Sequence, residues 1–243
     1  TYAVVLANPQ SYAVAATVTG GALASAKQVT LAPRGQSGDV QTVELPWVTA
    51  LLQKRTQCYQ SGASDPLDCV ARSSLAPSGA YQITSDGPIA AYQFNPLRYV
   101  QTLLGTKYSY TNDASLLLPE IALGKHYLAV TYGNWSNETL GPYSEDVTLV
   151  HGGFVAITGT ADGTTVTVQL SATVYDPFNE SQVLAPGTHD FMLDRGDVLQ
   201  LVGKLENEDL TGTRVVASSP IAVFVGHDCT RVPDGRPACN HLE

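Results

Sequence analysis

Four blocks of sequence occur twice in this chain, in the same order, and this duplication limits the fold more than any other feature. The first copy reads YAVVLANPQSYAVAATV, VTLAPRG, VQTVELPW and GAYQITSDGPIAAYQFN. The second copy reads GFVAITGTADGTTVTVQL, QVLAPG, GDVLQLVG and GTRVVASSPIAVFVGHD. Because a repeat of this length corresponds to one structural unit, the sequence predicts two tandem modules of the same fold.

The blocks themselves have the periodicity of strands. In each copy, apolar and polar residues alternate, meet an Asn8-Pro9 or Asp162-Gly163 turn and alternate again, which is a hairpin pattern. We expect a type I′ turn at Asp162-Gly163. The last strand of each copy follows Pro88 or Pro220, and proline suits the first residue of a strand. We therefore expect this last strand to be an inner strand of each module.

Composition supports an all-β chain. The chain is 44% hydrophobic and 14% charged, so it has few of the charged residues that favour long helices. We predict two tandem, internally duplicated antiparallel β-sandwich modules: 1–97, which lacks a first strand that would precede residue 1, and 125–243, which begins with the strand HYLAVTY. Residues 98–124 connect them. A short helix is predicted at 47–55 or around 97–104.

Charge and hydropathy limit the partners. The formal net charge is −9 and no basic cluster exists, which argues against a nucleic-acid ligand. No apolar run reaches the length that spans a bilayer, so we expect no membrane insertion by this segment.

The four cysteines form two local pairs, Cys58 with Cys69 and Cys229 with Cys239. Pairing of these neighbours is the simplest of the three connectivities that four cysteines allow. Two such disulfides indicate an oxidising compartment, so we expect an extracellular or cell-surface location. Three sequons, at Asn134, Asn137 and Asn179, fit secretion if the source is eukaryotic.

The second copy also resembles a known family. The phrases NDASLLLPEIALGKHYLAVTY, GFVAITGTADGTTVTVQL, GDVLQLVG, DLTGTRVVASSPIAVFVGHDC and CNHLE are similar to the N-terminal domain of the IgGFc-binding family, from about Thr111 to Glu243. A weaker similarity continues over 1–97. The resemblance implies a β fold and a place in a larger secreted or surface protein, and it supplies no catalytic residue.

One group of residues has the chemistry of a metal site. His227, Asp228, His241 and Glu243 flank the second cysteine pair, and imidazole and carboxylate are ligands of zinc and similar ions. The structural interpretation, in which His227 and His241 bond to loop backbone, is favoured because the pair lacks a fixed ligand spacing. We expect no cofactor.

Three further motifs have structural explanations that we prefer to functional ones. Arg195–Asp197 reads RGD, an adhesion motif, but Gly196-Asp197 also fits a turn before a strand. The acidic residues at 65–68 and 206–209 lack the spacing of a calcium loop. Nucleophile elbows, zinc-protease helices and phosphate-binding glycine loops are absent from the sequence, so we expect no enzyme.

Aromatic residues mark the candidate contact surface. Tyr132, Trp135 and Tyr143 lie in one connecting loop, 132–146, and exposed aromatics are enriched where proteins bind protein or glycan ligands. The first functional hypothesis is an extracellular adhesion or binding module of a larger protein. The alternative is a structural subunit of a fibre or surface layer that self-associates by strand exchange. A secreted hydrolase ranks third.

Overall fold

The computed structural model describes residues 2–51, 72–95, 97, 100–101, 107–108, 113–138, 148–179, 181–230 and 240–242. These residues form antiparallel strands and two 3-10 turns, η1 (Thr49–Leu51) and η4 (Glu120–Ala122), without an α-helix. The all-β prediction is confirmed. Within the described residues, the helix predicted at 47–55 is the single turn η1, and the alternative at 97–104 contains strand β8 (Val100–Gln101).

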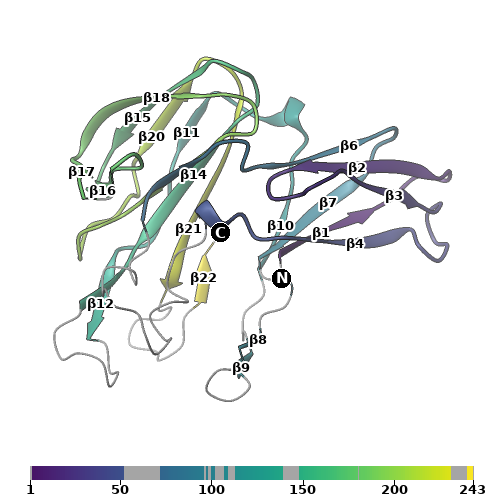
Figure 1. Cartoon of the computed structure of the whole chain (residues 1–243), viewed down its shortest axis with the longest axis horizontal. Coiled ribbons are helices and arrows are strands. Elements are labelled where there is room, and N and C mark those ends of the chain that lie inside the picture. Colours follow the sequence, from purple (N-terminus) through teal and green to yellow (C-terminus); the bar gives the residue numbers. More distant parts are fainter. Residues whose placement is uncertain are drawn as a thin grey trace. The chain divides into compact units, whose positions relative to one another are not determined.

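The chain divides into two compact units (Figure 1). Unit 1 contains Thr1–Thr49 and Ser78–Leu123, and unit 2 contains Ala50–Pro77 and Gly124–Glu243. The predicted boundaries, 1–97, 98–124 and 125–243, differ from this division in two ways. A segment inside the first predicted module belongs to unit 2, and almost all of the predicted connecting segment belongs to unit 1.

Unit 1 is a sandwich of two sheets. One sheet has the order β10-β7-β1-β4, and the other has the order β3-β2-β6. The strands are β1 (Tyr2–Ala7), β2 (Val14–Gly20), β3 (Lys27–Leu31), β4 (Val40–Leu45), β6 (Tyr81–Ser85), β7 (Ala90–Asn95) and β10 (Asp113–Leu116). Both sheets contribute to one core, which includes Val4 and Leu6 of β1 and Ala16 and Val18 of β2.

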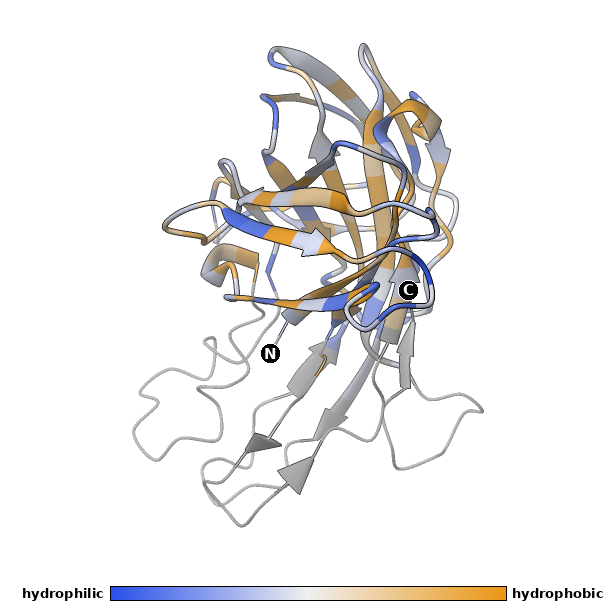
Figure 2. Cartoon of the chain, turned by 90° about the vertical axis from the view of Figure 1, so that its right-hand side faces the viewer, coloured by the Kyte–Doolittle hydropathy of each residue, from blue (hydrophilic) through white to orange (hydrophobic). Residues whose placement is uncertain are grey.

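Unit 2 is a larger sandwich of the same kind. Its sheets have the orders β22-β21-β14-β19-β5 and β11-β20-β15-β18. The strands are β5 (Ser74–Ala76), β11 (His126–Leu128), β14 (Gly153–Gly159), β15 (Thr164–Leu170), β18 (Gly187–Leu193), β19 (Val198–Val202), β20 (Arg214–Ala217), β21 (Ile221–Thr230) and β22 (Asn240–Leu242). Burial alternates along β14, β15, β18 and β20, and the buried apolar faces of both sheets share one core. Figure 2 colours the chain by hydropathy, with apolar segments on the strands of the sandwich.

The duplication in sequence is a duplication in structure. The order β7-β1-β4 of unit 1 corresponds to β21-β14-β19 of unit 2, and β6-β2-β3 corresponds to β20-β15-β18. Equivalent core positions are buried alike: Val4 and Leu6 are 1% and 0% exposed, and Val155 and Ile157 are both 0% exposed. The predicted inner strands, β7 and β21, each have a paired strand on both sides.

The predicted hairpins are wrong, because the strands on either side of each turn lie in different sheets. β1 pairs with β4 and β7, whereas β2 pairs with β3 and β6. Similarly, β14 and β15 lie in opposite sheets, so the turn at Asp162-Gly163 crosses the sandwich. The alternating pattern is the same in both cases, since each strand needs one apolar face whether it pairs with its neighbour or packs opposite it.

Strand β5 belongs to unit 2, although it lies between the two parts of unit 1 in sequence. It follows β4 and precedes β6 in sequence, yet it pairs with β19 of unit 2. All five residues of β19 are buried, and β5 covers the edge of that strand. Ser73 accepts a hydrogen bond from the Val202 N–H at 2.8 Å, and Leu75 packs on the unit 2 core.

Three short hairpin pairs complete the described structure: β8 with β9 (Lys107–Tyr108), β12 (Trp135–Glu138) with β13 (Thr148–His151), and β16 (Val174–Tyr175) with β17 (Val183–Leu184). Among the described residues, no helix has the length and apolarity to cross a membrane.

Candidate functional site

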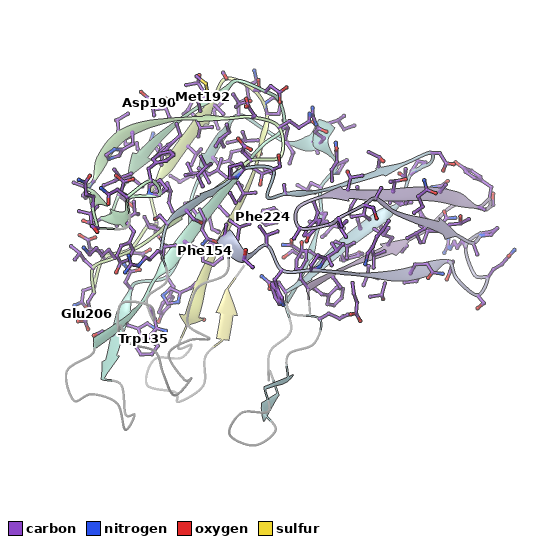
Figure 3. The ribbon with its side chains drawn as sticks, viewed as in Figure 1. Trp135, Phe154, Asp190, Met192, Glu206 and Phe224 are labelled. Atoms are coloured by element: carbon purple, nitrogen blue, oxygen red, sulfur yellow. The ribbon has the colours of Figure 1, made fainter. Side chains whose placement is uncertain are left out.

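The candidate site is the end of unit 2 that carries Trp135, formed by residues 131–138, 148–153 and 203–211 and called the Trp135 end below. Figure 3 shows Trp135 and Glu206 at this end. The chain enters it from β11, which contains residues 126–128 of the predicted strand HYLAVTY and pairs with β20. The next residues, 129–134, run beside the loop between β19 and β20.

Asn134 fixes this segment. Its side chain is 3% exposed, its Nδ2 donates to the Leu205 carbonyl at 2.9 Å, and its Oδ1 accepts from the Gly153 N–H at 2.9 Å. Its backbone N–H donates to Glu208 O at 2.7 Å, and its carbonyl accepts from the Asn207 N–H at 2.9 Å. One residue therefore joins β14 to the loop at 205–208.

Three glycines make room for this arrangement. A Cβ on Gly203 would lie 2.5 Å from Asn134 Nδ2, and a Cβ on Gly152 would lie 2.6 Å from Gly203 O. On Gly153 it would lie 3.0 Å from the Thr131 Cβ. Larger residues at 203 and 152 would push the segment away from the sheet, so the close approach depends on glycine.

A carboxylate network lies next to Asn134. The Thr131 hydroxyl donates to Asp209 Oδ1 at 2.6 Å, and the Thr211 N–H donates to the same oxygen at 2.8 Å. Burial by itself raises the pKa of the Asp209 carboxyl. The hydrogen bonds from Thr131 and Thr211 and the nearby charge of His227 outweigh burial and lower that pKa below its ordinary value.

This lowered pKa predicts an acid-sensitive contribution to stability. Since the folded state holds the Asp209 proton more weakly than the unfolded chain, the stabilisation is present above the ordinary carboxyl pKa and is lost as pH falls through the folded value. The Asp209→Asn variant should therefore lose less of its free energy of unfolding between pH 5 and pH 2 than the wild type, as measured by urea unfolding. Equal pH slopes for the two proteins would contradict this account.

Tyr132 and Trp135, which lie before and after Asn134 in sequence, each make one aromatic contact. The rings of Trp135 and His151 are stacked, with centroids 4.1 Å apart and planes 10° apart, across the β12–β13 pair. The Tyr132 ring meets His227 edge-on, with centroids 6.0 Å apart. His151 and His227 are buried, whereas Trp135 and Tyr132 are half-buried, so each pair has a histidine inside and a larger ring toward the surface.

The surface of the Trp135 end combines aromatic rings with carboxylates. Half-buried aromatic rings offer apolar faces, and Glu206 is exposed, with a carboxylate that is able to accept hydrogen bonds. Glu208 is already engaged, because its carboxylate accepts from the Thr173 N–H at 2.6 Å and from the Thr173 hydroxyl at 3.2 Å. The described residues contain no group of three or more His, Cys, Asp or Glu side chains arranged to hold a metal ion.

The predicted site residues fall in different places. Tyr132 and Trp135 both lie at the Trp135 end, while Tyr143 lies outside the described residues. His227 is buried in β21 opposite Leu242 of β22, and His241 lies next to Leu242 in that strand, although its side chain is outside the described part. The four cysteine side chains, Cys58, Cys69, Cys229 and Cys239, also lie outside it, so the disulfide pairing stays a prediction.

Other predicted features are structural in the described part. Gly196 has a φ of +85°, and the Arg195 N–H donates to Asp162 Oδ1 at 3.0 Å, so the RGD sequence forms the turn before β19. Asn134 was singled out in the sequence only as a sequon, yet it is the residue that holds the site together. The glycine pair Gly152-Gly153 was the available signal that another segment approaches this strand closely.

Comparison with known proteins agrees with the resemblance noted in the sequence. Residues 113–243 match the model of a protein family described as IgGFc binding protein. A human protein named IgGFc-binding protein is 30% identical over 132 residues, which cover 54% of this chain and 2% of the human protein. No solved structure matches the chain. The matched region includes the whole Trp135 end and leaves out β5.

Proposed function

Because the chain belongs to the IgGFc-binding family, its family match covering residues 113–243, we propose that it is an extracellular binding module of a larger secreted or cell-surface protein. It recognises a protein or glycan ligand through the Trp135 end of unit 2, and it performs no catalysis. The observation that carries this proposal is the stacked Trp135–His151 pair on a short hairpin.

The stacking favours binding because it fixes an aromatic side chain before a ligand arrives. A tryptophan held by a ring on one face loses little conformational freedom when a ligand contacts the rest of its surface. Tryptophan and tyrosine are also the residues that most often dominate binding energy at protein interfaces. Tyr132 lies three residues away, on the segment that Asn134 fixes.

The location also supports this role. Binding residues commonly lie on loops that a rigid scaffold positions, and the Trp135 end joins loops to the ends of β14 and β19. The net charge of −9 favours ligands that are neutral or basic over acidic ones. The even number of cysteines supports an extracellular location.

The experiment is a binding screen of the full chain against neutral glycans, mucins and, in view of the human relative's name, human IgG Fc. Trp135→Ala should weaken binding of the retained ligand by about tenfold or more, as for other aromatic hot spots. The matched control is Trp47→Ala, because Trp47 is the chain's other tryptophan and lies in unit 1.

Both variants must keep a cooperative unfolding transition, so that lost binding reports on the surface. Unchanged affinity in Trp135→Ala, or a larger loss in Trp47→Ala, would refute the assignment to the Trp135 end. Turnover of a glycan or protein in the screen would refute the non-catalytic part.

A further inference from the structure

The two sandwiches differ at two edges: in unit 2, β5 pairs with β19 and β11 pairs with β20, whereas no described strand holds either position beside the equivalent strands of unit 1, β4 and β6. In unit 2, β20 has β15 on one side and β11 on the other. In unit 1, the equivalent strand β6 has β2 on one side, and no described strand pairs with its outer edge (Figure 1). Since the order β6-β2-β3 matches β20-β15-β18, the outer edge of β6 occupies the position at which unit 2 binds β11.

The bonds that hold β11 define what such an edge requires. The Ala217 N–H donates to Lys125 O at 2.8 Å, and the Ala129 N–H donates to Thr213 O at 2.9 Å. The Tyr127 hydroxyl adds a contact beyond the backbone, because it donates to Ile221 O at 2.8 Å. An extended backbone with a tyrosine at its centre therefore fits this edge.

Unit 1 presents equivalent backbone groups at the outer edge of β6. Matching Pro88 with Pro220 makes Ser85, Tyr81 and Ile89 the counterparts of Ala217, Thr213 and Ile221. The Asp86 N–H donates to Ala15 O at 3.0 Å, toward β2. Since N–H groups alternate in direction along a strand, the Ser85 N–H points to the outer edge, as the Ala217 N–H does in unit 2.

The incomplete burial of two unit 1 core residues also favours a tyrosine-bearing strand at the outer edge of β6. Val215 and Ile221 of unit 2 are both 0% exposed, and Tyr127 packs against their core. Their counterparts in unit 1, Ile83 and Ile89, are half-buried. A ring in the position of Tyr127 would cover the apolar surface that these two isoleucines expose.

The edge also lacks the features that normally block strand addition. Charged residues, prolines and bulges protect exposed edges, and β6 reads YQITS, with none of them. The three other outer strands of unit 1 each carry a charged residue: Lys27 in β3, Glu44 in β4 and Asp113 in β10. The β6 edge is therefore the most open of the four.

We propose that the outer edge of β6 binds a tyrosine-bearing extended segment of a neighbouring module of the same fold, which adds as an antiparallel strand in the way that β11 does in unit 2. The β11 segment of this chain is already paired with β20. The strand that adds to β6 is therefore the equivalent of β11 in the neighbouring module. Such an addition would link modules in series, which is the elementary step of a strand-exchange assembly.

The test uses a fluorescein-labelled peptide with the sequence of residues 122–131, ALGKHYLAVT, titrated with the full chain and followed by fluorescence anisotropy. We expect saturable binding, and about tenfold weaker binding of a peptide in which the tyrosine is replaced by alanine. Ser85→Pro should abolish binding, because it removes an outward N–H and leaves the bonds toward β2. The control variant Thr84→Ser keeps the outward N–H of Ser85 and should bind the peptide as the wild type does.

Fluorescence of Trp47 during unfolding, in a Trp135→Phe background, establishes that unit 1 of the Ser85→Pro variant is folded. The proposal is overturned if the peptide does not bind saturably, if both peptides bind equally, or if Ser85→Pro binds as tightly as the wild type. The last result would place the peptide elsewhere, for example on β20 after displacement of β11. Trp135→Ala should leave peptide binding unchanged, so this test is independent of the proposed ligand surface.

Discussion

Replacing residues 72–77 by a glycine–serine segment of equal length is expected to lower the free energy of unfolding of unit 2 by about 4–6 kcal/mol. The replacement removes the pairing of β5 with β19 and the bond from the Val202 N–H to the Ser73 hydroxyl. It also removes the Leu75 and Ala76 side chains from the core. Net hydrogen bonds of about 1 kcal/mol each, with about 1–2 kcal/mol for the half-buried leucine and about 0.8 kcal/mol for the buried alanine methyl, give this range.

The two tryptophans separate the units in this experiment. Trp47 reports on unit 1 in a Trp135→Phe background, and Trp135 reports on unit 2 in a Trp47→Phe background. Denaturant unfolding should shift the Trp135 transition and leave the Trp47 transition in place, although the replaced residues lie between two parts of unit 1 in sequence. Leu75→Met, which conserves volume, should cost less than about 1.5 kcal/mol. An unmoved Trp135 transition would contradict the role of β5.

Asn134→Ala is expected to destabilise unit 2 by about 2–4 kcal/mol. Alanine leaves the Leu205 carbonyl and the Gly153 N–H without the side-chain partner that each now has, and an unpaired buried group costs about 1–3 kcal/mol. A glycan on Asn134 has no room beside Gly203, so this sequon is incompatible with the folded unit.

The matched control for this substitution is Asn179→Ala at another sequon. Asn179 is exposed, and its Oδ1 accepts one bond, from the Ser181 N–H at 3.1 Å. Its replacement should change the free energy of unfolding by less than about 1 kcal/mol. Equal effects at the two positions, measured by urea unfolding, would show that Asn134 does not hold the Trp135 end together.

The strand pattern of the fold could be predicted from the sequence, whereas the pairing could be predicted only in part. The repeated blocks identify equivalent strands, since Leu6 and Ile157 occupy the same core position. Alternation does not distinguish a hairpin from two strands that face each other across a core, so the pattern indicates a hairpin at Asp162-Gly163 where the chain crosses between two sheets. The three residues of β5 are too few to show a period, and nothing local in them indicates a partner in unit 2.

The candidate site, too, could be predicted only in part from the sequence. Aromatic enrichment pointed to Tyr132 and Trp135, because ring size and polarity are visible in sequence. The contribution of Asn134 depends on Leu205 and Gly153, which lie 71 and 19 residues away, and only the folded chain brings them together. The stacking of Trp135 on His151 depends likewise on the register of β12 and β13.

The most direct test of the central claim, that recognition occurs at the Trp135 end of unit 2, is amide hydrogen exchange of the full chain with and without the ligand retained in the binding screen. We predict that bound ligand slows exchange at residues 131–138 and 148–153 and in the loop at 203–211. Protection confined to unit 1, or to the face formed by β15 and β18, would contradict the claim.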